Sequence, residues 1–138
     1  MISFTIPGKP KALKRHRVSQ RGGMYDPSSV DKKQMWLQIA RYKPPTPFAG
    51  DIFIKLIFYM PRPKNHYRTG KYSHLLKDSC KDIIYHSIVP DLDNLIKLLF
   101  DCISGTDRMI CDDSQICILQ AEKLYGSERT EVTIEEIS

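Results

Sequence analysis

The sequence predicts an α/β fold, organised as a single small domain over residues 1–138, with a mixed sheet of about four strands and two main helices. The length of 138 residues suits one domain with its own core. The apolar residues also change period along the chain, from two, as in strands, to about 3.6, as in helices. In chain order the segments predict strand, helix, strand, long loop, helix, strand and strand.

The first part of the chain predicts a strand, a loop and a helix. Residues 1–8 alternate Ile2, Phe4 and Ile6 with polar positions, as a half-buried strand does. The basic segment 9–27 contains turn residues, so we expect an exposed loop. Residues 28–43 carry a helical stripe that ends at the sequence PPTPFAG: Val30, Met35, Trp36, Ile39 and Ala40.

The clearest strand covers residues 51–60, which are rich in Ile and Phe and end at a proline. About 30 residues with little periodicity follow, from 61 to 90. A loop of this length in a small domain is unusual and is often functional or mobile. The more apolar face of the strand is expected in the core: Ile52, Ile54, Leu56, Phe58 and Met60.

Residues 91–104 predict an amphipathic helix that ends at Gly105. Asp93, Lys97 and Asp101 recur every four residues, so they lie on the face opposite the buried stripe. Either Asp91 or Asp93 is suited to cap the helix. The buried stripe is predicted to be Leu95, Leu98, Leu99, Cys102 and Ile103.

Two strands are predicted after this helix, over residues 114–126 and 129–137. Gly126 and its neighbours offer a tight hairpin turn between them. We expect the first of these strands to be central or nearly central in the sheet.

Charge is distributed unevenly along the chain. Residues 1–90 carry 17 Lys and Arg against 5 Asp and Glu, whereas residues 91–138 carry 4 against 11. The basic N-terminal part is suited to bind a polyanion, and converging acidic groups are suited to bind a divalent cation. An excess of solvated lysines explains the bulk charge equally well. No secretory leader or membrane span is evident, so we expect a cytoplasmic protein without a membrane partner. The four cysteines are then reduced thiols, and their spacing disfavours zinc.

Two pairs of aspartates are the candidate active-site residues. Taken alone, Asp91 and Asp93 have a simple structural explanation as helix caps, with Asp93 and Lys97 forming a weak surface ion pair. The sequence CDDSQ adds Asp112 and Asp113 before a strand, where adjacent like charges cost stability. We expect the short connection from the helix to bring the two pairs together. Such carboxylates suit Mg²⁺ or Mn²⁺, and with Lys97 they suit metal-assisted phosphodiester hydrolysis.

These segments resemble the RusA family of Holliday-junction resolvases. The resemblance is carried by PDLDNLIKLLFDCISG and CDDSQI, and the flanking IPGKPKALKRHR and MPRPKNHYRTGKYSHLL are also similar to the family. It implies a homodimeric, Mg²⁺-dependent endonuclease of a bacterial or phage-infected cell that cuts four-way DNA junctions. It implies the catalytic residues Asp91, Asp93, Asp113 and Lys97, with Asp112 as a further metal ligand beside the three catalytic carboxylates.

Two basic segments are predicted to bind the phosphates of branched DNA, although solvated loops are the simpler explanation for such residues in an arbitrary protein. A positive surround is needed here because an acidic site alone repels DNA. The predicted contacts are Lys9, Lys11, Lys14, Arg15, Arg17, Arg62, Lys64, Arg68 and Lys71. Two other functions stay open at this point: a module that binds branched DNA without cutting it, and a flap or other structure-selective nuclease.

Overall fold

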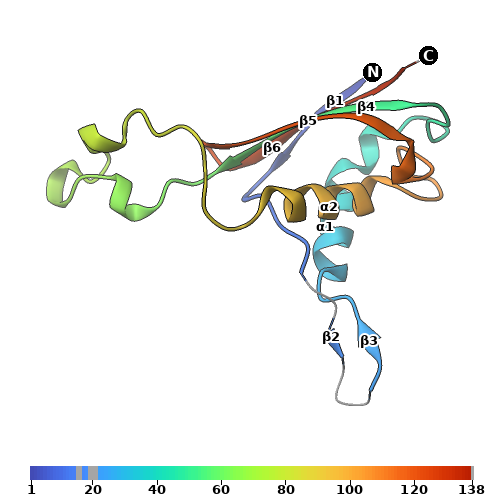
Figure 1. Cartoon of the computed structure of the whole chain (residues 1–138), viewed down its shortest axis with the longest axis horizontal. Coiled ribbons are helices and arrows are strands. Elements are labelled where there is room, and N and C mark those ends of the chain that lie inside the picture. Colours follow the sequence, from blue (N-terminus) through green and yellow to red (C-terminus); the bar gives the residue numbers. More distant parts are fainter. Residues whose placement is uncertain (15–16, 19–21, 138) are drawn as a thin grey trace.

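The structure is a computed structural model that describes residues 1–14, 17–18 and 22–137. A four-stranded sheet and two α-helices form the body of the molecule (Figure 1). The strands are β1 (Ile2–Pro7), β2 (Arg17–Val18), β3 (Met24–Tyr25), β4 (Ile52–Met60), β5 (Ile116–Tyr125) and β6 (Arg129–Glu136). The helices are α1 (Ser29–Ile39) and α2 (Leu92–Ile103), with 3-10 turns η1 (Ala40–Tyr42), η2 (Lys64–His66), η3 (Gly70–Tyr72), η4 (Asp78–Cys80) and η5 (Asp113–Gln115).

The main sheet has the strand order β1-β6-β4-β5. Strand β4 pairs in parallel with β5 and antiparallel with β6, and β1 pairs antiparallel with β6. The predicted α/β class, with a mixed sheet of four strands and two helices, is therefore confirmed. Strands β2 and β3 form a separate small ribbon inside segment 9–27, which was expected to be loop throughout.

Two expectations about the C-terminal strands were wrong. Strand β5 is an edge strand rather than a central one, and β5 and β6 form no hairpin because β4 lies between them. The reason is the parallel pairing of β5 with β4, which leaves the opposite side of β4 open for the returning β6. The connecting turn crosses the end of β4, where a side chain at Gly126 would lie 2.7 Å from the Tyr59 ring.

Both helices cover the same face of the sheet (Figure 1). The even-numbered residues of β4 are buried against them, and the predicted stripe of α2 is buried at every position. Helix α1 follows its prediction less well. Ile39 is buried and Met35 and Trp36 pack against the core, but Val30 is exposed because it lies in the first turn, away from the sheet.

The long segment 61–90, called the arm below, projects from the end of the sheet and returns to α2 (green to yellow in Figure 1). It contains η2, η3 and η4 and an isolated bridge between Tyr67 and Leu76. The prediction of a long segment with little regular structure is confirmed. In the described part of the chain, no helix is both long and apolar enough to cross a bilayer.

Candidate active site

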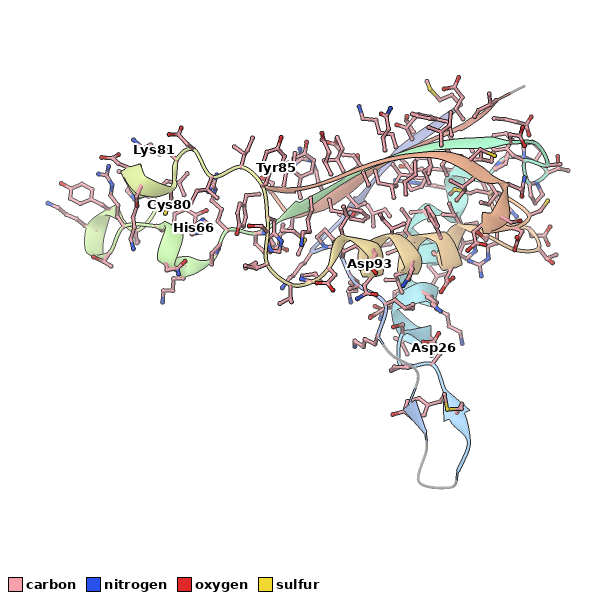
Figure 2. The ribbon with its side chains drawn as sticks, in the orientation of Figure 1. Asp26, His66, Cys80, Lys81, Tyr85 and Asp93 are labelled. Atoms are coloured by element: carbon pink, nitrogen blue, oxygen red, sulfur yellow. The ribbon has the colours of Figure 1, made fainter. Side chains whose placement is uncertain are left out.

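The first acidic pair, Asp91 and Asp93, lies exposed at the start of α2. Asp91 occupies the N-cap position with an extended backbone (φ −69°, ψ 143°), yet within the described residues its side chain accepts no capping hydrogen bond. Lys97 Nζ lies 3.6 Å from Asp93 Oδ2, one turn along an exposed face, as predicted. The Asp91 side chain therefore does not cap the helix, whereas Asp93 lies in the first turn and forms the predicted ion pair with Lys97. Figure 2 shows Asp93 at the start of α2.

The chain that enters α2 is held by a lysine whose role was not predicted from the sequence. Lys123 Nζ donates hydrogen bonds to the carbonyl oxygens of Ile88 and Pro90, both at 2.6 Å. The His86 N–H in turn donates to the Lys123 carbonyl oxygen at 3.0 Å. These contacts fix the residues just before Asp91 to the C-terminal half of β5. A lysine on a strand of alternating polarity gives no sequence signal for this role.

The second acidic pair lies on the tight turn η5. Asp112 caps this turn, since its Oδ2 accepts from the Ser114 N–H at 3.1 Å. Hydrogen bonding to the Ser114 side chain, and then to its backbone N–H, holds the pKa of the Asp112 carboxyl below its usual range. Gln115 anchors the turn through Oε1, which accepts from the Cys111 and Asp112 N–H groups at 2.8 Å. Asp113 is exposed. The two neighbouring aspartates thus have different surroundings, and Asp112 has a structural role as a cap.

Within one chain the two acidic pairs lie at opposite ends of the body. Asp91 follows the segment held by Lys123, whereas Asp113 directly precedes the start of β5. The seven strand steps from Ile116 to Lys123 span about 23 Å, and the twelve residues of α2 span about 18 Å. Among the described residues, no three His, Cys, Asp or Glu side chains are close enough to hold a metal ion together.

The expected convergence of the carboxylates is therefore not present within one chain. The short connection brings the chain to the C-terminal end of α2, not back to its start (Figure 1). Strand β5 must then run along the whole helix before it reaches the level of Asp91. The expectation was wrong because a short loop fixes only the end of the helix at which the next strand begins. It does not bring that strand back to the start of the helix.

The N-terminal basic segment lies next to α2. The Leu13 N–H donates to the Asn94 carbonyl oxygen at 2.9 Å, and the Lys14 N–H donates to Ser28 Oγ at 2.8 Å. Lys11 pairs with Asp31 at 3.1 Å. A shallow groove runs between residues 9–14, Asp31 and Pro90. Lys9, Lys11 and Lys14 thus lie beside the first acidic pair; Arg15 is outside the described residues, and so is the side chain of Arg17.

The arm carries a second basic surface, some of which is structural. Arg62 stacks over the Tyr125 ring at 5.1 Å and donates to the Cys80 carbonyl oxygen at 3.2 Å. Arg68 pairs with Asp78 at 3.3 Å, and Lys64 and Lys71 are exposed. A groove on the arm also includes Lys77, which was not predicted as a contact although it lies in the same basic stretch: Lys64, Asn65, Tyr67, Arg68, Thr69, Gly70, Ser73 and Lys77.

The arm meets the sheet at an aromatic contact. The rings of His66 and His86 each meet the Tyr125 ring edge-on, with centroids 5.1 Å apart. Burial lowers the pKa of His86, and the nearby Lys123 ammonium lowers it further. Both effects favour the neutral form of His86, and its ring serves as a packing element at the base of the arm.

An open pair of carboxylates beside a lysine, between two basic surfaces, is an arrangement that suits cleavage of a phosphodiester backbone. On a small α/β scaffold, such an arrangement suits a DNA endonuclease. The family model for endodeoxyribonuclease RusA matches residues 7–135, and the chain belongs to this family of metal-dependent nucleases that resolve Holliday junctions. The comparison with curated proteins finds no match.

Proposed function

We propose that the chain resolves four-way DNA junctions by paired symmetric nicks, as a homodimer that uses Mg²⁺, with Mn²⁺ as a substitute. Residues 1–138 act as one endonuclease domain. The observation that carries this proposal is the start of α2, where Asp91 and Asp93 are free of capping and Lys97 lies 3.6 Å from Asp93. A dimer suits the reaction because two matched cuts need two sites related by a two-fold axis.

The donor set at α2 fits Mg²⁺. This ion binds through one or two carboxylates, keeps several waters and takes its remaining ligands from substrate phosphate. Asp91 and Asp93 supply two carboxylates at one exposed position, and Asp113 is proposed as the third catalytic carboxylate. When bound, the ion would polarise the scissile phosphate and make a coordinated water more acidic. Asp112 was predicted as a further ligand, and the capping bond to Ser114 occupies one of its two oxygens.

Lys97 is proposed to stabilise the negative charge that gathers on the phosphate during cleavage. Its ion pair with Asp93 holds the ammonium on the same side of α2 as the carboxylates. Both side chains are largely exposed, so the pair adds little to stability and its value lies in orientation.

The basic surfaces are proposed to hold the arms of the junction by their phosphates, without reading bases. Lys9, Lys11 and Lys14 are suited to the strand that is cut, because their segment is hydrogen-bonded to Asn94 through Leu13. The remaining proposed contacts are Arg15, Arg17, Arg62, Lys64, Arg68 and Lys71.

A cleavage assay with matched substrates tests this function. Purified protein is incubated with a labelled four-way junction and with a linear duplex of the same sequence, with and without Mg²⁺. We expect paired nicks on the junction alone that need the metal and are lost in Asp91→Asn, Asp93→Asn and Asp113→Asn, while binding survives. Asp101→Asn is the matched control on the same helix face, since Asp101 pairs with Lys32 instead. Tight binding without cleavage under any divalent metal would contradict the proposal.

A further inference from the structure

A cavity of about 250 Å³ lies between the end of β1 and helix α1, apart from the two acidic pairs. Strand β1 ends at Pro7, and the next residue, Gly8, has a positive φ of 94°, a conformation that favours glycine. The chain therefore turns away from the sheet here and passes to α1. The ion pair between Lys11 and Asp31, at 3.1 Å, ties it to the helix. The cavity lies beside this crossing segment.

The lining of the cavity combines apolar groups with amides. Ile6 is buried, Met35 packs against the core, and Thr130, which pairs with Ile6 across the sheet, is 5% exposed. Two amide side chains, Gln34 and Gln38, line the cavity from one face of α1, a helical turn apart. Within the described part of the chain, neither amide takes part in a hydrogen bond. Apolar surface with a few polar groups that converge on it is typical of a ligand site.

The cavity is continuous with the groove beside the first acidic pair. Both are lined by residues 9–11 and by Asp31, and the groove extends to Pro90, directly before Asp91. The shared lining thus includes two of the lysines that are proposed above to contact phosphates. A DNA strand whose phosphates follow these lysines towards Asp91 therefore passes beside the cavity.

We propose that the cavity binds one unstacked nucleobase of the strand that is cut, with the amides of Gln34 and Gln38 hydrogen-bonded to the edge of the base. This inference rests on the proposed function and adds to it how a branched substrate is selected. The size is suitable, since the cavity has about eight times the volume of a water molecule and a purine or pyrimidine has a similar number of non-hydrogen atoms.

The chemistry of the lining favours a base over a phosphate. Each amide offers both donors and an acceptor, and this combination matches the edges of the bases. The apolar side chains of Ile6 and Met35 suit the flat face of a ring. A phosphate in the cavity would meet the Asp31 carboxylate, which repels it. Lys9 and Lys11 lie where the cavity joins the groove, so they are placed for the phosphates on either side of the bound base.

A site of this kind distinguishes branched from linear DNA. A base must leave its stack to enter the cavity, and the free-energy cost is least where pairing and stacking are already interrupted. The branch point of a four-way junction is such a place. A continuous duplex is still attracted by the lysines, because that attraction does not depend on base stacking. It leaves the cavity empty, however, and is held less tightly.

Junctions that lack single bases test the proposal without any assay of cleavage. A series of four-way junctions is prepared, each without the base at one position near the branch point in both symmetry-related strands. Affinity is measured without divalent metal, so that the DNA is bound and not cut. We expect removal of the base at one position to weaken binding by the wild-type protein about 10-fold or more.

The double variant Gln34→Met, Gln38→Met identifies the site. Both glutamines are exposed, and Met and Gln have similar helix propensities, so the melting temperature should match that of the wild type. Removal of the same base should weaken its binding by less than about three-fold, because the amide contacts are already absent. Leu37→Gln is the matched control. It changes an exposed residue of α1 that does not line the cavity, and it should behave as the wild type.

The outcomes are distinct. Wild-type binding that depends on no single base would overturn the proposal, because an occupied cavity requires one. Equal sensitivity in the wild type and the double variant would overturn it too, since the base would then be held elsewhere. A protein that shows the expected dependence on one base but cuts no junction would contradict the proposed function, while the base site would stand.

Discussion

Lys123 and Pro90 are joined by a hydrogen bond of 2.6 Å between the lysine ammonium and the proline carbonyl oxygen. The same ammonium holds the Ile88 carbonyl oxygen at 2.6 Å. A strand in the C-terminal half of the chain thereby fixes the backbone just before Asp91. The position of the first carboxylate depends on β5 as much as on its own helix.

We therefore expect Lys123→Met to impair cleavage more than DNA binding. The change removes two charge-assisted hydrogen bonds, each of which contributes up to about 1.5–3 kcal/mol of stability, and frees the segment before Asp91. The measurement is the Mg²⁺ concentration needed for half-maximal nicking, which should rise, alongside junction affinity at fixed salt. Lys55→Met, on the exposed outer face of β4, is the control and should change neither. An unchanged Mg²⁺ requirement in Lys123→Met would refute this role.

Lys97→Ala separates chemistry from stability. The ion pair with Asp93 is exposed, so its loss should change the free energy of unfolding by less than about 0.5 kcal/mol. Cleavage should fall by about 100-fold or more, because a positive charge is removed next to the reacting phosphate. Thermal unfolding and single-turnover nicking measure the two effects. A variant that cuts at the wild-type rate would remove Lys97 from the mechanism.

Asp112 and Asp113 are expected to respond differently to the same substitution. Asp113→Ala should abolish cleavage, whereas Asp112→Ala should mainly loosen η5, because Asp112 Oδ2 caps that turn. Single-turnover nicking and thermal unfolding of the two variants measure the difference. Equal loss of cleavage in both variants would contradict this division.

The free energy of unfolding at acidic pH gives a second test of the role of Asp112. Its pKa is lowered in the folded protein, so its contribution is complete above its unfolded pKa of about 3.9 and is lost as the pH falls through the lower folded value. The difference in stability between wild type and Asp112→Asn should therefore stay constant from about pH 5 to 8 and shrink below about pH 4. A difference that changes with pH near neutrality would point to another group.

The arm should set the salt dependence of binding. Replacing Lys64, Arg68 and Lys71 by Gln should make the slope of log affinity against log salt concentration shallower, by about 0.9 for each phosphate that the protein no longer neutralises. The control is Lys33→Gln with Lys55→Gln, which removes exposed charge from α1 and the outer sheet face. Fluorescence anisotropy with a labelled junction at several salt concentrations measures the slope. An equal reduction in the control would show a non-specific effect of net charge.

Thiol reactivity should divide the four cysteines into two pairs. Cys111 and Cys117 are exposed, whereas Cys80 and Cys102 are buried, and burial raises the pKa of Cys102 to about 11. We expect two thiols to react quickly with an aromatic disulfide reagent at pH 8 and all four after denaturation. Fast reaction of four thiols in the native protein would contradict the packing of α2.

The features that the sequence predicted well are local. Alternation in residues 51–60 identified β4 and its buried face, and a spacing of three and four residues identified the buried stripe of α2. Both patterns arise within one element, where the period of the backbone decides which side chains share a face. The pair of Asp93 and Lys97 was predictable for the same reason.

The features that the sequence could not predict depend on pairing between distant segments. Nothing near residue 116 shows that β5 lies at the edge, because the strand order is set by which partners remain free. The hydrogen bond from Lys123 to the Pro90 carbonyl oxygen joins residues that are far apart in the chain. The sequence around a single lysine in a strand does not indicate such a contact. The distance between the two acidic pairs follows from the same tertiary arrangement.

The arm has an energetic consequence of its own. Within residues 61–90, only Cys80 and His86 are buried, and the arm joins the body through Tyr125, the bridge between Tyr85 and Leu124, and the Lys123 hydrogen bonds at its end. A segment with so little buried apolar surface opens at a lower free energy than the sheet. Amide hydrogen exchange in the arm should therefore be fast and independent of global unfolding. The arm, proposed above to bind the junction, can then change shape while the sheet and helices remain folded.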